Sequence, residues 1–267
     1  MPECHTLHRA ADEQRPHFAG RRPTASSPQG RFAEGAASID GALCRDVEAF
    51  GKHLLYPFEG PEGEDRHLHI HLGLFGRIRQ HRGELPEPRG LVRVRLAVPG
   101  YAVDISGPTA CEVLDEAERA RLLARLGPDP LRDDAKPAKA WAKIAKSRTA
   151  IGTLLMDQSV VAGIGNIYRA EFLWLARVHP KLPGKDLPKR KWNAIWADAV
   201  KWMRIGVETG LIITTEGPTP KSRRSRRRFN IYKRAECPRC GTPTTTFMLA
   251  ARKVYCCEVC APPPEAS

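Results

Sequence analysis

Two pairs of cysteines near the C-terminus have the spacing of a metal site. Cys237 and Cys240 are separated by two residues, as are Cys257 and Cys260, and sixteen residues lie between the pairs. Each pair can bind an ion from a tight turn, and four thiolates form a closed tetrahedral zinc site with a structural role. We therefore predict one structural Zn²⁺ ion. Cys256 is the alternative to Cys257, although its longer spacing to Cys260 suits a zinc knuckle less well.

A hairpin must bring the two cysteine pairs together. Residues 241–243 (GTP) are typical of a turn, and residues 244–248 favour a strand. Five of the eight cysteines lie in the last thirty-one residues, which indicates a reducing compartment and not a chain-wide disulfide framework. Cys4, Cys44 and Cys111 are interpreted as buried or incidental thiols.

The charge of the chain predicts a polyanionic partner. There are 43 Lys and Arg against 30 Asp and Glu, a formal charge of +13, which favours nucleic acid. Residues 221–234 hold eight basic and no acidic side chains, although a solvated loop or a localisation tag would also explain them. Apolar runs such as residues 150–156 are far shorter than a bilayer span, and no apolar segment follows Met1. We therefore expect neither a transmembrane protein nor a signal peptide.

Residues 1–118 are predicted to form a β-sandwich or barrel, with a helix only at residues 2–9. Within residues 66–80 apolar and polar side chains alternate, so that one strand face would hold Leu68, Ile70 and Leu72 and the other His67, His69 and His71. Residues 91–98 alternate in the same way. The three histidines could bind a metal from one strand face, but we prefer a solvated or DNA-facing polar face.

The middle of the chain is predicted to be helical. We expect a first helix over residues 115–127, ended by prolines, and then four more, at residues 144–147, 149–158, 167–176 and 192–207. The turn at residues 162–166 (AGIGN) contains two glycines that permit close backbone approach, and a following helix N-terminus can bind phosphate. A plain turn between helices is the alternative interpretation.

Taken in order, these motifs resemble the formamidopyrimidine-DNA glycosylase / endonuclease VIII family of base-excision repair enzymes. The resemblance extends over nearly the whole chain, and its motifs are Met1-Pro2-Glu3, Gly51-Lys52-His53, LMDQ at 155–158, VAGIGNIYRAE at 161–171, IYKR at 231–234 and the cysteine hairpin. The opening PE-x-H-T-L-H-R is similar to the actinobacterial endonuclease VIII-like branch.

The resemblance implies an α+β fold with several domains. We expect an N-terminal β-sandwich catalytic domain with an N-terminal helix at residues 1–118 and a helical helix-two-turn-helix domain at residues 119–220. The basic loop and a C-terminal four-cysteine zinc finger would follow at residues 221–267.

The resemblance also implies the chemistry of a bifunctional DNA glycosylase and AP lyase that acts on oxidised bases, which we expect to be pyrimidines. Once Met1 is removed, the Pro2 amine attacks C1′ of the damaged nucleotide, and the resulting iminium permits β- and δ-elimination. An α-amino group titrates near ~7.7–8.0, so a useful fraction is unprotonated at neutral pH. Glu3 protonates the sugar ring oxygen and shuttles protons. Lys52 binds a phosphate beside the reacting sugar.

Four further residues are implied to contact DNA. Asn166 and Arg252 match phosphate-binding positions of the family, and the position of Arg252 supports Cys257 as the zinc ligand. Leu74 and Phe75 lie where relatives insert a side chain into the base stack when a nucleotide is extruded, although either could be a core residue. Cys4 stands where this branch usually has glycine, which places a thiol beside the active-site turn.

We expect a bacterial, cytoplasmic, nucleoid-associated monomer whose partner is damaged DNA, as duplex, bubble or single strand, with no membrane contact. The alternative is a catalytically inactive zinc-ribbon and helix-two-turn-helix DNA-binding protein. It would share every feature except Pro2, Glu3 and Lys52. An unrelated zinc enzyme that uses His67, His69 and His71 is a weaker hypothesis, because four-sulfur sites are closed and structural.

Overall fold

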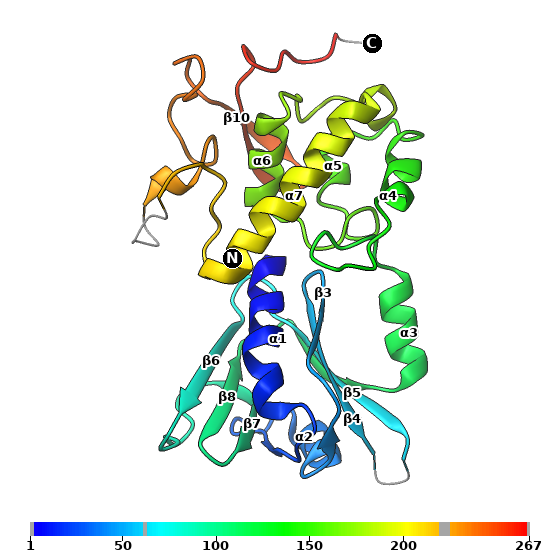
Figure 1. Cartoon of the computed structure of the whole chain (residues 1–267), viewed down its shortest axis with the longest axis vertical. Coiled ribbons are helices and arrows are strands. Elements are labelled where there is room, and N and C mark those ends of the chain that lie inside the picture. The colour runs from blue at the N-terminus through cyan, green and yellow to red at the C-terminus, as the bar shows by residue number, and fades with distance from the viewer. Residues whose placement is uncertain (1–2, 61–62, 219–224, 266–267) are drawn as a thin grey trace. The chain divides into compact units, whose positions relative to one another are not determined.

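Two units divide the chain, residues 1–125 and residues 126–267. The computed structural model describes residues 3–60, 63–218 and 225–265, and Pro2 therefore lies outside the described residues (Figure 1). The second unit contains both the helical segment and the cysteine hairpin, which were predicted as separate domains.

The first unit is a sandwich of two antiparallel sheets, which confirms the predicted N-terminal fold. One sheet has the strand order β1-β7-β8-β6 and the other β2-β4-β5-β9, with β3 paired to β4. The strands are β1 (Thr24–Ser26), β2 (Leu43–Cys44), β3 (Glu48–Phe50), β4 (His53–Glu59), β5 (Asp65–His71), β6 (Arg77–Arg82), β7 (Val92–Val98), β8 (Tyr101–Ser106) and β9 (Ala110–Leu114).

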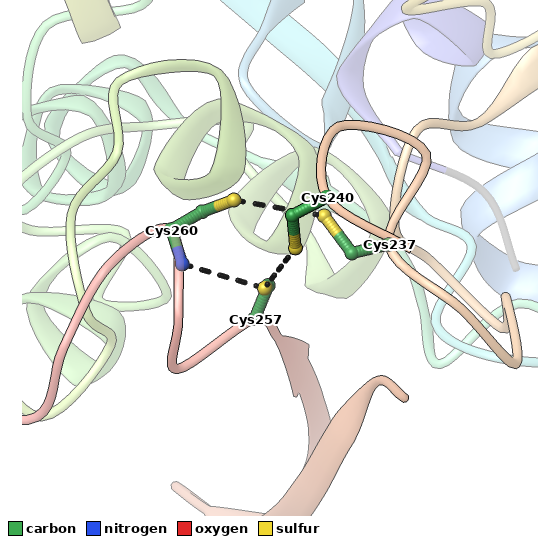
Figure 2. Close-up of side chains that lie close together, drawn as sticks. All are labelled: Cys237, Cys240, Cys257 and Cys260. Carbon is green, nitrogen blue, oxygen red and sulfur yellow. Dashed lines mark hydrogen bonds between the residues drawn. The ribbon is translucent and has the colours of Figure 1, made fainter. Parts of the chain in front are cut away.

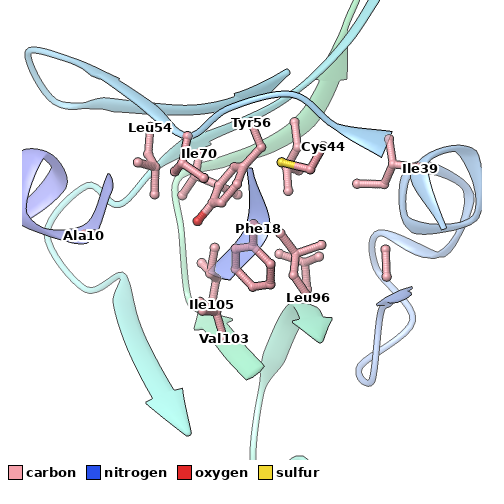
Figure 3. Packing of buried hydrophobic residues seen from close by; sticks show 14 of the residues in the cluster. Ala10, Phe18, Ile39, Cys44, Leu54, Tyr56, Ile70, Leu96, Val103 and Ile105 are labelled. Carbon is pink, nitrogen blue, oxygen red and sulfur yellow. The ribbon is translucent and has the colours of Figure 1, made fainter. Parts of the chain in front are cut away.

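Alternation of apolar and polar residues builds the core between these sheets. Leu54 and Tyr56 of β4 face Leu96 and Val103 of the other sheet, and all four are fully buried (Figure 3). Complete burial of a leucine or valine side chain stabilises the fold by roughly 1.5–3 kcal/mol. The core therefore determines which face of each strand points inward, and the outer faces and the turns are left for other contacts.

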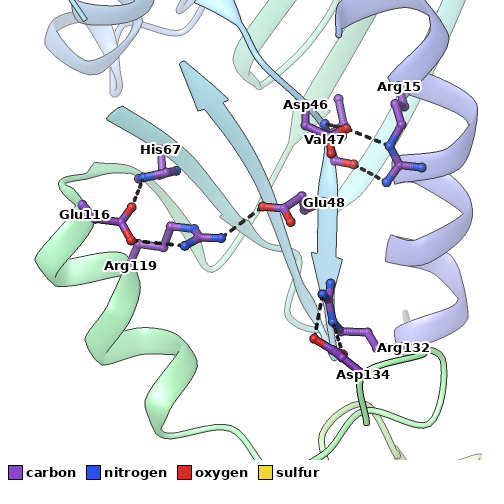
Figure 4. Close-up of polar contacts among 9 residues, drawn as sticks. All are labelled: Arg15, Asp46, Val47, Glu48, His67, Glu116, Arg119, Arg132 and Asp134. Atoms are coloured by element: carbon purple, nitrogen blue, oxygen red, sulfur yellow. Dashed lines mark hydrogen bonds and ion pairs between the residues drawn. The ribbon is translucent and has the colours of Figure 1, made fainter. Parts of the chain in front are cut away.

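Helix α1 (Cys4–Phe18) covers the sandwich and is longer than the predicted residues 2–9. Its buried stripe includes Leu7 and Phe18, and it packs against β3 and β4 (Figure 1). Arg15 secures its last turn, because its guanidinium donates to Asp46 Oδ1 at 2.8 Å and to Val47 O at 2.7 Å (Figure 4). These contacts attach the last turn of α1 to the segment that leads into β3.

Two shorter helices complete the first unit. They are α2 (Ala33–Ile39) and α3 (Glu116–Ala124). The second matches the predicted helix at residues 115–127. Asp115 caps it in a reciprocal arrangement with Glu118, in which each side chain accepts from the backbone N–H of the other residue. Helix α3 packs against β5 and β9, on the sheet face that carries the histidines.

The second unit is helical and ends in a hairpin. Its elements are α4 (Pro137–Ile144), α5 (Ile151–Leu154), α6 (Asn166–Leu175), η1 (Gly184–Asp186), α7 (Lys189–Thr209), η2 (Arg226–Arg228), β10 (Thr245–Leu249) and β11 (Arg252–Cys256). Helices α6 and α7 and the β10–β11 hairpin confirm the predictions for those segments. Within the described residues, no helix has the length and apolar content that would let it cross a membrane.

Two predicted helices were wrong in extent. The helix expected at residues 144–147 does not form, because α4 ends at Ile144. The helix expected at residues 149–158 is only the single turn α5. Side-chain groups compete with the helix there: Asp157 Oδ1 accepts from the Ser159 N–H at 2.8 Å, and Gln158 Oε1 accepts from the Gly163 N–H at 2.8 Å. Such bonds favour turns over helix continuation.

Candidate functional site

Glu3 is the N-cap residue of α1 and is fully buried. Its carbonyl accepts the Thr6 N–H at 2.9 Å, which begins the helix. The positive end of the helix dipole favours negative charge at this position. Cys4, the first residue of the helix, is also fully buried, so its thiol belongs to the packed interior of the first unit. The role of Pro2 stays a prediction, because this residue lies outside the described part of the chain.

Lys52 lies in the two-residue turn that joins β3 to β4. Phe50 pairs with His53 across the hairpin, and Gly51 between them has φ of 59°. This left-handed conformation is the one that glycine adopts readily in tight hairpins. The turn therefore gives Lys52 a defined position at the end of the hairpin, with His53 as the first residue of β4.

The histidines of β5 are not a solvated face, which corrects the prediction for two of them. The predicted alternation is confirmed, but only 3% of His67 and 4% of His69 are exposed, because α3 packs against this side of the sheet. The two rings also bind different carboxylates. His67 Nε2 lies 2.8 Å from Glu116 Oε2, and His69 Nδ1 lies 2.9 Å from Glu112 Oε1. Among the described residues, His67, His69 and His71 form no common group of metal ligands.

Leu74 and Phe75 lie in the turn between β5 and β6. Leu74 is 43% exposed and Phe75 is 84% exposed. The alternative that they are core residues is therefore wrong. A Cβ at Gly76 would lie 2.3 Å from Leu72 O, so this tight turn requires glycine. The turn holds two apolar side chains in solvent, as an inserting wedge requires; that role stays a prediction.

Asn166 begins α6 and is tied to the hairpin of the second unit. Its Nδ2 donates to Lys253 O at 3.1 Å, and its Oδ1 accepts from Arg169. The guanidinium of Arg169 also donates to Gly152 O and Leu249 O, each at 3.2 Å. Arg169 thus joins α5, α6 and the hairpin around Asn166. Sequence reasoning missed this role, although Arg169 lies within the family motif at residues 161–171.

A second buried charge, Glu171, organises the chain around the basic loop. Its Oε2 accepts from Thr214 Oγ1 at 2.6 Å, from the Asn230 N–H at 2.7 Å and from Asn230 Nδ2 at 3.1 Å. Its Oε1 accepts the N–H groups of Ile231 at 2.9 Å and Tyr232 at 2.7 Å. Both ends of the segment between Thr214 and Asn230 are therefore fixed to α6. The motif at residues 161–171 ends on Glu171, but its partners lie 43 to 61 residues away along the chain and were not predicted.

Only the start of the predicted basic segment at residues 221–234 is outside the described residues, which omit residues 219–224. Arg227 is exposed and Arg228 is half-buried. Arg252 is the first residue of β11, is exposed and pairs with Leu249 across the hairpin. Its position at the end of the hairpin is compatible with a phosphate contact, which stays a prediction.

The four predicted cysteines come together in a cluster that could hold one metal ion (Figure 2). The Sγ atoms of Cys237 and Cys260 lie 3.9 Å apart, and those of Cys240 and Cys257 lie 3.4 Å apart. Zinc–sulfur bonds of ~2.3 Å in a tetrahedron place the sulfurs about 3.8 Å apart. The donor set therefore fits one zinc-sized ion. Cys256 is buried elsewhere, with its Sγ 4.0 Å from His179 Nε2, so the open choice is resolved in favour of Cys257.

Hydrogen-bond donors surround these sulfurs. Trp174 Nε1 donates to Cys237 Sγ at 3.3 Å, and the Cys260 N–H donates to Cys257 Sγ at 3.4 Å. Burial acts to raise the pKa of Cys257, but hydrogen bonds from Thr242 and the Cys260 N–H outweigh it and lower this pKa to about 6. A thiolate is the form that binds a metal. The four thiols do not ionise alike, because burial and the neighbouring cysteines raise the pKa of Cys260 to about 12.

Two segments of the chain match known domains. Residues 1–108 match the formamidopyrimidine-DNA glycosylase N-terminal domain, and residues 126–217 match the formamidopyrimidine-DNA glycosylase H2TH domain. The chain is 43% identical over 270 residues to endonuclease 8 1 of Mycobacterium tuberculosis, which covers 97% of this chain and 99% of that protein. The chain belongs to the formamidopyrimidine-DNA glycosylase / endonuclease VIII family.

Other members of the family are similar over much of their length. The chain is 31% identical over 245 residues to the formamidopyrimidine-DNA glycosylase of Thermomicrobium roseum, with 81% of each covered. The fold matches a crystal structure of Lactococcus lactis Fpg with DNA that contains Fapy-dG, at a TM-score of 0.80 and 22% identity, covering 98% of this chain and all of that one (100%). These comparisons confirm the family and the fold expected from the sequence motifs.

Proposed function

We propose that this chain is a bifunctional DNA glycosylase and AP lyase of base excision repair that removes oxidised pyrimidines. The observation that supports it most strongly is the 43% identity to an endonuclease 8 over 97% of the chain. The match to the N-terminal domain of the family covers residues 1–108, which include Pro2 and Glu3. The family supplies the glycosylase and lyase chemistry. The preference for oxidised pyrimidines follows from the endonuclease VIII-like opening of the sequence.

In the proposed mechanism the chain's own N-terminal residues perform the covalent chemistry. The secondary amine of Pro2 attacks C1′, the C1′–N bond to the base breaks, and the base departs as it gains a proton. The C1′–O4′ bond then breaks as Glu3 protonates the ring oxygen, which leaves an iminium between Pro2 and the open sugar. The iminium withdraws electrons, which permits loss of a C2′ proton and β-elimination of the 3′ phosphate; δ-elimination of the 5′ phosphate follows. Glu3, buried at the start of α1, would exchange protons with the sugar.

Three residues are proposed to bind the DNA backbone around the lesion. Lys52 on its hairpin turn supplies a cation, Asn166 an amide at the start of α6, and Arg252 a guanidinium on the zinc hairpin. Leu74 and Phe75, exposed on the β5–β6 turn, would fill the space that an extruded nucleotide leaves in the stack. The partner is therefore damaged DNA, bound by the protein as a monomer in the bacterial cytoplasm.

Zinc is proposed as the ion held by Cys237, Cys240, Cys257 and Cys260. When bound, it would supply structure and no reaction chemistry, because four protein sulfurs leave no open position for a substrate. The division of labour proposed for the chain is a catalytic sandwich at residues 1–118, a helix-two-turn-helix domain at 119–220 and a zinc finger with the basic loop at 221–267.

Borohydride trapping on DNA that contains an abasic site tests this function directly. Borohydride reduces the iminium to a stable covalent link between enzyme and DNA. Mass spectrometry must first show that Met1 has been removed, because an acylated Pro2 nitrogen is not a nucleophile. The wild type should form a link that maps to Pro2, and Pro2→Gly and Glu3→Gln should diminish it.

A folded, zinc-loaded wild type that lacks Met1, binds DNA and forms no covalent link would support the non-enzymatic alternative. In that event the chain would be a zinc-ribbon and helix-two-turn-helix DNA-binding protein, and Cys4→Gly would be the first reversion to examine. If trapping succeeds, excision rates on thymine glycol and on oxidised purines decide the preference for pyrimidines.

A further inference from the structure

A hydrogen-bonded row of three side chains crosses the outer face of the first unit's β2-β4-β5-β9 sheet. Glu112 of β9 lies beside His69 of β5, with 2.9 Å between Oε1 and the His69 Nδ1. On its other side, His69 Nε2 lies 2.8 Å from Nδ1 of His53 on β4. His53 directly follows Lys52 in the chain, so the row ends at the turn that presents this lysine.

The chemistry of the groups gives the row one direction. A carboxylate can only accept hydrogen bonds, so His69 must carry its proton on Nδ1 and donate it to Glu112. His69 Nε2 then has a lone pair and accepts from His53 Nδ1–H. His53 is consequently left with a lone pair on its Nε2. Both rings are held in the Nδ1–H tautomer, and the carboxylate at one end determines the tautomer at the other.

We propose that Glu112, acting through His69, is a positioning residue that fixes the tautomer and orientation of His53 and thereby the turn that presents Lys52 to DNA. The inference about Lys52 rests on the proposed function; the inference about the tautomers does not. The row is a way to hold a neutral, oriented imidazole beside a lysine that must meet a phosphate.

The surroundings of His53 keep it neutral. Burial is the main cause that lowers its pKa to about 3, and the neighbouring His69, His71, Arg125 and Lys52 add to it. Burial also lowers the pKa of His69, against the opposing effect of Glu112. The His71 ring completes the group, with its centroid 5.0 Å from that of His53. An imidazolium in this position would repel the ammonium of Lys52.

The same strand contains a matched pair that lacks this connection. His67, two residues before His69, lies 2.8 Å through its Nε2 from Glu116 Oε2 (Figure 4). The Nδ1 of His67 is buried and, among the described residues, has no hydrogen-bond partner. This pair therefore has the Nε2–H tautomer, and its bonds do not run to His53: Glu116 is joined instead, through Arg119, to Glu48 of β3. The carboxylate side chains of Glu112 and Glu116 are similarly exposed, at 53% and 56%, which makes Glu116 a suitable control.

Nitrogen NMR of the histidine rings tests the tautomers in the full-length, zinc-loaded protein. We expect Nδ1–H for His53 and His69 and Nε2–H for His67. Glu112→Gln keeps the shape of the side chain but can donate as well as accept, so the enforced direction is lost and His53 should shift toward Nε2–H. Glu116→Gln should leave His53 unchanged. A wild type in which His53 is Nε2–H would overturn the proposal.

Binding and kinetics then test whether the tautomer affects Lys52. Relative to wild type, Glu112→Gln should bind duplex DNA with a stable abasic analogue about threefold to tenfold more weakly and raise KM more than it lowers kcat. Glu116→Gln should stay within about twofold. If Glu112→Gln shifts the tautomer but leaves affinity and KM at the wild-type values, the positioning role is refuted. Because the analogue binds without reacting, this result can be read even if the wild type shows no lyase activity.

Discussion

The two units hold their proposed DNA-contacting residues by different means. In the first unit an apolar core fixes two sheets, and Lys52, Leu74 and Phe75 occupy tight turns between strands. In the second unit fully buried charged side chains, Arg169 and Glu171, join helices to segments distant in the chain. An apolar core gains its stability from many small contacts, whereas a buried charge depends on a few specific partners.

This difference predicts where single substitutions are harmful. Shortening one side chain in an apolar core costs the lost contact and its cavity. Removing one member of a buried polar network leaves the other members without partners, each at a cost of about 1–3 kcal/mol. We therefore expect the second unit to be the more sensitive to changes of single polar atoms, and the first to be the more sensitive to pH through its histidines.

Loss of a zinc ligand should have the largest effect and should be confined to the second unit. Cys257→Ser should reduce the zinc content from one ion per chain to none and unfold the hairpin, because structural zinc contributes about 10–16 kcal/mol in isolated fingers. Metal analysis and hydrogen exchange of both units measure this. Cys256→Ser is the control and should retain the ion. If Cys256→Ser lost zinc and Cys257→Ser kept it, the ligand assignment would be wrong.

Glu171→Gln should have the next largest effect, lowering the free energy of unfolding by about 3 kcal/mol. The new amide NH2 group would face N–H and O–H groups that now donate hydrogen bonds to the carboxylate. Because two donors cannot bond to each other, the ends of the basic loop would be released. Urea unfolding provides the measurement. Glu216, whose exposed carboxylate pairs with Lys201 at 2.5 Å, is the matched control. Glu216→Gln should change stability by less than about 1 kcal/mol, and equal losses for both variants would contradict the contrast.

The first unit should lose stability as pH falls. An unfolded histidine titrates near ~6.5, whereas burial lowers the pKa of folded His53 to about 3. The unfolded chain therefore binds more protons between these values, and the free energy of unfolding falls with pH across this window, by about 2 kcal/mol at pH 5 from His53 alone. His69 and His71, whose pKa values burial also lowers, act in the same direction.

Urea unfolding of the wild type and His53→Asn at pH 7.5 and pH 5 measures this effect. Asparagine keeps a hydrogen-bond donor but does not titrate, so the loss of stability between the two pH values should be smaller in the variant. Identical losses would show that His53 does not contribute to the pH dependence.

The smallest effect on stability is expected for Phe75→Ala. Because 84% of Phe75 is exposed, its removal should change the free energy of unfolding by less than about 0.5 kcal/mol. Affinity for DNA with an abasic analogue should nevertheless fall about threefold to tenfold, since the stacking wedge is lost. Leu91, which is 75% exposed in the same unit, is the control. Equal losses of affinity for Phe75→Ala and Leu91→Ala would mean that the wedge is not specific.

Local spacing was enough to predict much of this protein. The C-x2-C pairs of the hairpin, the alternation of β5 and β7 and the helices α3, α6 and α7 were all predictable, because each depends on neighbours within a few residues. The family motifs from Met1-Pro2-Glu3 to IYKR at 231–234 likewise required only order and identity. These features predicted the family, the fold class and the cysteine pairs, while the choice between Cys256 and Cys257 was made by the structure.

Tertiary structure decided what lay beyond that range. Glu171 meets Ile231 60 residues away, and Arg169 meets Leu249 80 residues away, separations at which sequence patterns contain no pairing information. The same is true of the histidines: alternation placed them on one face, but only the packing of α3 decided that His67 and His69 are buried. The sequence by itself determined which side chains share a strand face and which chemical groups the protein can use. The tertiary structure decided which of those groups lose water, because burial depends on what the rest of the chain packs against them.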